Sequence, residues 1–181
     1  QSFQEKISQE LITGRSQLNL VPESTMQSMA LQQYQSFLSE NKVVAQGTSK
    51  DAEMVKRVGQ RIAAAVTRYM TQHNMANEVS SYKWEFNLVN SKEVNAWCMP
   101  GGKVVVYTGL LPVTQNETAL ACVMGHEIAH AIARHGNERM SQGLVMQGIQ
   151  VAGAVALNEN PTAVNIFNQA FGVGGNVGML A

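Results

Sequence analysis

Two histidines and a glutamate lie within one five-residue run, His126-Glu127-Ile128-Ala129-His130. On an α-helix, residues four apart differ by about 40° around the axis and about 6 Å along it, so both imidazoles leave one face. Imidazole nitrogens are zinc ligands, and Glu127 projects beside the pair, where its carboxylate can take a proton from a water on the metal. The spacing therefore predicts His126 and His130 as zinc ligands and Glu127 as general base, which is peptide hydrolysis chemistry.

The flanking residues predict that this run lies in the middle of a helix. Polar caps and early negative charge are available at 116–118, and apolar residues then recur at helical spacing up to Ile132. The alternative is a pair of surface histidines with a solvated glutamate. The alanines and isoleucines around the motif instead indicate an apolar, buried helix, in which unpartnered charge would be costly. The metal interpretation is therefore favoured.

Composition narrows the class of protein. The 181 residues are 45% hydrophobic and 14% charged, which suits one globular domain with a substantial core. Lys and Arg together number 13, as do Asp and Glu, so nothing indicates a nucleic-acid partner. The two cysteines are too few for a disulfide framework and lack the pairing of a structural zinc site.

Patterns elsewhere predict the elements that position this helix. Residues 1–21 carry polar turns and are expected to form an extended arm before a folded body at 22–181. Strands are expected at 82–88 and 103–107, joined through a turn that ends at Gly102, as a hairpin-like sheet beside the metal helix. In that arrangement 103–107 is an edge strand that could hold an extended substrate. The other expected helices are 22–38, 51–73, 137–157 and 162–171.

Several separated segments share features of one known family. They are Thr13-Gly14-Arg15-Ser16-Gln17-Leu18, Asn95-Ala96-Trp97, Pro100-Gly101-Gly102-Lys103, Tyr107-Thr108-Gly109-Leu110-Leu111, the His126 to His130 run and Arg134-His135. Together they resemble the HtpX and BepA-type zinc metallopeptidases of peptidase family M48. The likeness covers most of the chain and is strongest for bacterial envelope members without a membrane-spanning domain.

The resemblance implies an α+β, zincin-like (gluzincin) fold, mostly helical with a small sheet beside the active-site helix. It implies one Zn²⁺ per chain, the same roles for His126, His130 and Glu127, and polypeptide substrates. The implied activity is endopeptidase action on misfolded or unassembled cell-envelope proteins. The implied location is the bacterial periplasm or outer membrane, with an N-terminal lipid that is not in this chain as a route to the membrane.

The third zinc ligand is the point at which this sequence departs from the family. The family supplies a glutamate from a later helix, whereas after Glu138 the only acidic residue here is Glu159, with no later histidine. A catalytic zinc normally has three protein ligands and a water. We therefore expect 22–181 to be a zinc metalloprotease domain that lacks the C-terminal part carrying this ligand, with Glu159 as an alternative, although its Asn-Glu-Asn-Pro context favours a solvated turn.

Two further side chains, His135 and Cys122, are candidates for the third zinc ligand. His135 lies nine residues after His126, about 180° around the same ideal helix, so we expect it to pack or form a hydrogen bond instead. The metzincin pattern fails because Ala133 and Gly136 occupy its glycine and third histidine positions. Cys122 lies one turn before His126 and could supply a thiolate, but a small buried apolar role is favoured.

Two other functions remain open from sequence. A chaperone-like module could grip apolar client segments with its methionine-rich, glycine- and alanine-rich final third, with zinc structural or not bound. A latent protease could have its cleft blocked by one of its own segments.

Overall fold

The computed structural model describes residues 7–150 and 153–173. The long helices are α1 (Glu23–Glu40), α2 (Lys50–Gln72), α4 (Glu117–Ile132) and α5 (His135–Met146). The shorter elements are β1 (Ile7–Gln9), β2 (Ser16–Leu18), η2 (Ala76–Glu78), β3 (Glu85–Val89), β4 (Ala96–Met99), β5 (Lys103–Tyr107), η3 (Thr108–Leu110), α3 (Leu111–Thr114), α6 (Ala154–Asn158) and α7 (Pro161–Ala170). The predicted α+β class, mostly helical with a small sheet, is confirmed.

The main sheet has three strands in the order β3-β5-β4. β3 runs parallel to β5, with Leu88 opposite Val106, and β4 runs antiparallel to β5, with Cys98 opposite Val104. The tight turn of this hairpin uses Gly101 and Gly102 at φ values of 89° and 87°, which L side chains rarely adopt. Three predictions were wrong here: 96–99 forms a strand of its own, 82–88 and 103–107 do not form a hairpin because β3 and β5 run parallel, and 103–107 is the central strand rather than an edge.

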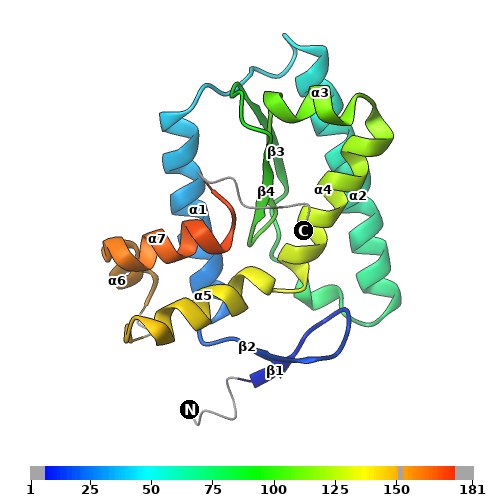
Figure 1. The fold of residues 1–181 in the computed structure, drawn as a ribbon. Helices are drawn as coiled ribbons and strands as arrows, with labels where there is room; N and C mark the ends of the chain where they lie inside the picture. Colours follow the sequence, from blue (N-terminus) through cyan, green and yellow to red (C-terminus); the bar gives the residue numbers. More distant parts are fainter. Residues whose placement is uncertain (1–6, 151–152, 174–181) are drawn as a thin grey trace.

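The sheet lies between two layers of helices, α1 on one side and α2 with α4 on the other (Figure 1). Alternate residues of β5 divide between two cores, as the two-residue period of a strand requires. Val104 and Val106 pack with the α2 and α4 side, whereas Val105 and Tyr107 pack with α1 and the C-terminal helices. All five β5 residues are buried, which is consistent with the continuous apolar run at 104–107 that follows Lys103.

The described part of the predicted arm is a hairpin. β1 and β2 pair in antiparallel fashion, and the Gln17 side-chain amide donates 2.9 Å to the carbonyl oxygen of Ala133 at the end of α4. The Leu20 N–H donates 2.9 Å to the Ser141 hydroxyl on α5. These contacts hold the hairpin against the C-terminal end of the metal helix, below it in Figure 1. The division into an arm at 1–21 and a domain at 22–181 stays a prediction.

The helix predictions were accurate at 22–38, 51–73 and 162–171, which correspond to α1, α2 and α7. The helix expected over 137–157 was wrong, because α5 ends at Met146 and α6 is a separate helix. Gly148 adopts a φ of 67° just after α5, a conformation that ends a helix. In the described part of the chain, every helix is too short or too polar to span a lipid bilayer.

Candidate metal and catalytic site

The motif lies on α4, a helix whose start is fixed by local chemistry. The Asn116 side chain accepts a hydrogen bond of 2.9 Å from the Ala119 N–H, an N-cap at the position expected from sequence. Leu120, Met124 and Ile128 are buried on one face, which packs against β4 and α2. The opposite face is open, since His126 is exposed and His130 half-buried. The helix is therefore buried on one side only, not all round.

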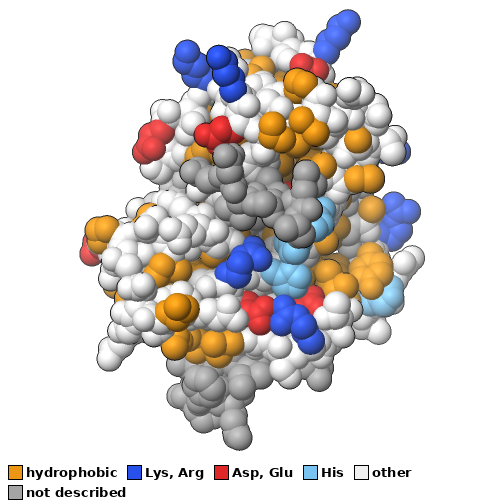
Figure 2. All heavy atoms as spheres, in the orientation of Figure 1, with side chains coloured by type: hydrophobic (Ala, Val, Ile, Leu, Met, Phe, Trp, Pro, Cys, Tyr) orange, Lys and Arg blue, Asp and Glu red, His pale blue; other side chains and the backbone are white. Residues whose placement is uncertain are grey.

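The two imidazoles of the motif face each other. The Nε2 atoms of His126 and His130 are 2.9 Å apart, and their ring centroids are 4.3 Å apart. Two nitrogens on a tetrahedral zinc are separated by about 3.3 Å when each Zn–N bond is about 2.05 Å. A small rotation of either ring would reach that spacing, so the pair fits two ligands of one ion. Histidine side chains gather in a hollow on this face of the molecule, next to charged side chains of both signs (Figure 2).

Glu127 follows His126 directly in the sequence, and its side chain is half-buried. Burial raises the pKa of its carboxyl to about 7, and the positive charge of Arg139 opposes that rise. Burial also raises the pKa of the Cys98 thiol on β4, with a smaller contribution from the negative charge of Glu127. The Glu127 carboxylate thus interacts electrostatically with Cys98 on β4 and with Arg139 on α5. A carboxyl group with a pKa near neutrality suits a general base.

The metal helix ends at a sharp change of direction. Arg134 adopts a left-handed conformation, with φ 60° and ψ 28°, so α5 starts afresh at His135. His135 Nδ1 then lies 2.6 Å from His130 Nδ1. His135 thus forms one of the two contacts expected of it, a hydrogen bond rather than packing alone, and its exclusion as a zinc ligand stays a prediction. The reasoning that placed it on the far side of the helix was wrong, because 126–135 is not one continuous helix.

The imidazoles at this end of the helix have low proton affinity. Burial lowers the pKa of His130 to about 4, assisted by the nearby His126, His135 and Arg139. Burial also lowers the pKa of His135, while the negative charge of Glu10 opposes that effect. Neutral imidazole is the form that binds a metal ion, so this environment favours ligation.

A third protein ligand is not found among residues 7–150 and 153–173, which contain no group of three His, Cys, Asp or Glu side chains able to hold a metal. Glu159 is exposed just after α6 and does not join the histidine pair. Cys122 does not join it either, and it is exposed, so the expected buried role was wrong. The roles assigned to His126, His130 and Glu127 stay predictions that this geometry supports.

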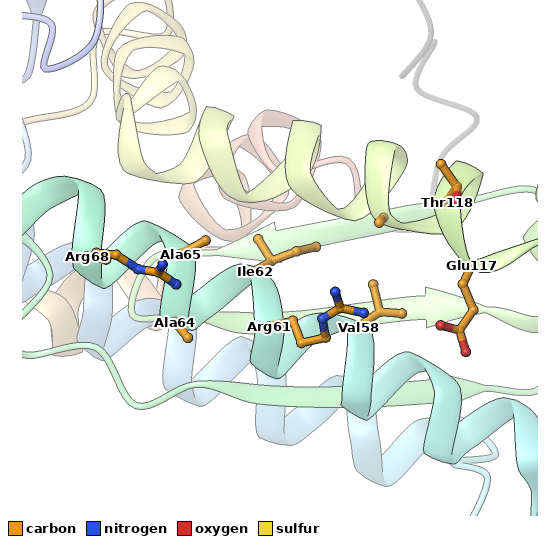
Figure 3. A pocket seen from close by; sticks show the side chains of 9 residues that line it. Val58, Arg61, Ile62, Ala64, Ala65, Arg68, Glu117 and Thr118 are labelled. Atoms are coloured by element: carbon orange, nitrogen blue, oxygen red, sulfur yellow. The ribbon is translucent and has the colours of Figure 1, made fainter.

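A separate groove of about 590 Å³ lies between α2 and the start of α4. Figure 3 shows Arg61 and Arg68 on α2 and Glu117 on α4 around it. The rest of the lining is mostly apolar or small: Val58, Ile62, Ala64, Ala65, Thr118 and Ala121. None of the motif residues lines this groove, so it is not the predicted catalytic cleft. The sequence feature that could have indicated this groove is the spacing of arginines among small residues on α2.

Facing imidazoles and a carboxylate on a helix beside a small sheet define a site of the metallopeptidase class. Residues 49–174 match peptidase family M48, well over half of the chain, and the chain belongs to that family. The family-level resemblance is therefore confirmed. The narrower resemblance to the HtpX and BepA type is not confirmed, because mitochondrial OMA1 metalloendopeptidases match the chain as well.

Three relatives illustrate the similarity. The mitochondrial metalloendopeptidase OMA1 of Arabidopsis thaliana is 42% identical over 72 residues, 40% of this chain and 15% of that protein. The mitochondrial metalloendopeptidase OMA1 of Bos taurus is 31% identical over 131 residues, 72% of this chain and 24% of that protein. The beta-barrel assembly-enhancing protease of Escherichia coli K12 is 39% identical over 75 residues, 39% of this chain and 15% of that protein.

These findings support a metalloendopeptidase and correct one prediction. The chain spans at most 24% of the length of these relatives, so their whole-protein properties are not transferred to it. The predicted bacterial envelope location, periplasmic or lipid-anchored, is contradicted, because the OMA1 relatives from plant, yeast and animal sources are mitochondrial proteins. The predicted location rested on the family resemblance alone and not on any segment of this sequence.

Proposed function

We propose that this chain carries the catalytic centre of a zincin-like zinc endopeptidase that cleaves unfolded or unassembled polypeptides. The observation that carries the proposal is the pair of Nε2 atoms 2.9 Å apart on an open helix face, with a half-buried carboxylate at the next residue. His126 and His130 would hold the zinc ion. When bound, zinc would supply Lewis-acid polarisation of the scissile carbonyl and acidify the attacking water.

Glu127 has the proton-transfer role in this proposal. Its carboxylate removes a proton from the attacking water as the new C–O bond forms, and then passes that proton to the amide nitrogen as the C–N bond breaks. The products are a carboxylate and an amine, so one water is consumed for each bond cleaved. A carboxyl pKa raised to about 7 by burial lets the same group accept the proton and release it near neutral pH.

The strand that would hold the substrate is β4, not β5. β4 pairs with β5 on one side only, and α4 packs beside it. At the opposite edge of the sheet, β3 already receives a hydrogen bond of 2.8 Å from the Val44 N–H to the Leu88 carbonyl oxygen. An added strand at β4 needs an extended backbone, which unfolded or unassembled proteins expose. This requirement supports the proposed substrate class.

Glu127→Gln tests the assignment because it removes the base and keeps the shape. The variant is expected to retain zinc and to cleave fluorescently labelled casein at least about 100-fold more slowly. Glu117→Gln is the matched control, since it makes the same change on the same helix at a residue that pairs with Arg57 instead. Undiminished cleavage by the Glu127 variant would overturn the proposed base.

One observation favours a second candidate, a client-binding module whose zinc site is structural or incomplete. The described residues hold no third ligand for the histidine pair. Under this alternative, casein binding would persist after Glu127→Gln and after chelation of metal, and the unaltered protein would show no turnover. Turnover that is lost on chelation and restored by zinc would exclude it.

A further inference from the structure

His130 has both ring nitrogens engaged. Its Nε2 lies 2.9 Å from His126 Nε2, and its Nδ1 lies 2.6 Å from His135 Nδ1. A neutral imidazole has one N–H donor and one acceptor nitrogen, so two facing nitrogens need one proton between them. If Nε2 of His130 is the nitrogen turned toward a metal, then Nδ1 carries the proton and His135 Nδ1 accepts it.

We infer that His135 is a positioning residue for His130, and that it fixes the ring orientation and the Nδ1–H form through this hydrogen bond. The part of the inference that concerns metal affinity rests on the proposed function. Histidine ligands commonly donate their second ring N–H to a carboxylate, a backbone carbonyl or a water, and loss of that acceptor weakens metal binding. In this chain the acceptor is a second imidazole, supplied from the next helix.

Arg134 places His135 at this point. Its left-handed conformation ends α4 and turns the chain, so that the first residue of α5 comes back beside the last turn of α4. The Arg134 guanidinium is 2.6 Å from the Glu78 carboxylate and 3.7 Å from that of Glu23. These ion pairs connect the turn to η2 and to α1. The Arg-His dipeptide thus has two roles, since the arginine sets the turn and the histidine reaches His130.

The residues on either side of His135 are held by distant elements. A Cβ atom at Gly136 would lie 2.0 Å from the ring of Phe171, so the residue that caps α7 packs directly against the start of α5. On the preceding side, the Gln17 amide donates to the Ala133 carbonyl oxygen, and one turn after His135, Arg15 pairs with Glu138 at 2.6 Å. The N-terminal hairpin and α7 therefore leave His135 little freedom to move away from His130.

Three variants test the inference. His135→Leu keeps bulk but removes the acceptor. His135→Asn restores one, because its amide oxygen is attached to Cγ as Nδ1 is in histidine. His73→Leu is the control, since His73 also forms a hydrogen bond through Nδ1, at 2.8 Å to the Tyr69 carbonyl oxygen, but at the end of α2. The measurements are the His130 tautomer in metal-free protein, by long-range ¹H–¹⁵N NMR, and zinc affinity by competition with a chromogenic chelator.

In the unaltered protein and in His135→Asn, His130 is expected in the Nδ1–H form, whereas His135→Leu gives a mixture of tautomers. Zinc affinity is expected to fall about 10- to 100-fold in His135→Leu and to stay within about threefold in His135→Asn and His73→Leu. Unchanged His130 tautomer and zinc affinity in His135→Leu would overturn the inference. If the unaltered protein binds no zinc, the proposed function fails, and the tautomer measurement in metal-free protein still decides whether His135 positions His130.

Discussion

Two glycines in the middle of helices should respond in opposite ways to the same substitution. Gly59 lies in α2 and Gly125 in α4, next to the metal motif. In an unobstructed helix, glycine to alanine stabilises by about 0.5–1 kcal/mol, because alanine loses less backbone entropy on folding. A Cβ at Gly125 would meet no heavy atom of residues 7–150 and 153–173 within 4 Å, so Gly125→Ala should show this gain in full.

Gly59→Ala should instead destabilise the protein. Its added carbon would lie 2.3 Å from Cδ1 of Phe86, whereas carbon atoms pack at about 3.5–4.0 Å, so the ring or the helix must move by more than about 1 Å. Phe86 is only 6% exposed and stacks on Trp84, with ring planes 7° apart, which restricts that movement. Overpacking of this kind costs about 1–3 kcal/mol, and subtracting the helix gain, middle value from middle value, leaves a net loss of about 1 kcal/mol.

The assay is urea unfolding followed by circular dichroism, with chelator present so that metal binding near Gly125 does not contribute. The two variants should differ in free energy of unfolding by the overpacking cost of about 1–3 kcal/mol, with opposite signs relative to the unaltered protein. Phe86→Leu combined with Gly59→Ala should cost less than the sum of the single changes, because the smaller side chain relieves the clash. Equal shifts of one sign for both glycines would refute this account of how α2 packs on β3.

Two further predictions concern titratable side chains. Because burial raises the pKa of the Cys98 thiol while Cys122 is exposed, a thiol reagent should modify Cys122 alone in folded protein and both after unfolding; equal rates in folded protein would contradict this. The hydrogen bond from Arg15 lowers the pKa of Glu138 below 4.5, so its contribution is present above that pH and lost as pH falls through the folded value. Glu138→Gln should therefore cost less than about 1 kcal/mol in urea unfolding at about pH 7 and a smaller amount at about pH 3, whereas equal losses would exclude the pair as the cause.

The parts of the structure that follow from local chemistry were predictable from sequence. The Asn116 cap, the apolar stripe after it and the spacing of His126 and His130 all lie within one helix, so backbone geometry alone relates them. α2 was equally predictable, because its apolar stripe is long and regular. Residues 103–107 read correctly as a strand, since a run of β-branched residues favours extended structure.

Pairing partners and helix breaks were not predictable in the same way. The choice of β3 as a parallel neighbour of β5, with β4 between them in sequence, depends on cores on both faces of the sheet. The break at Arg134 carries no proline or glycine signal at that residue. Its left-handed backbone is stabilised by ion pairs with Glu78 and Glu23, which lie far away in sequence. No helix period applied to 126–135 could have placed His135 correctly.

The same division runs through the catalytic site. The proposed metal ligands and the proposed base lie within little more than one turn of α4 and need only a helix to be assembled. The environment that would make them work comes from elsewhere: β4 packs on α4, Arg139 of α5 acts on the charge of Glu127, and His135 lies at Nδ1 of His130. Its neighbours Ala133 and Gly136 contact the N-terminal hairpin and Phe171, the residue after α7. A substitution in the hairpin or in α7 should therefore affect metal affinity without touching a ligand, whereas the motif alone in an isolated helix would present the same atoms without that support.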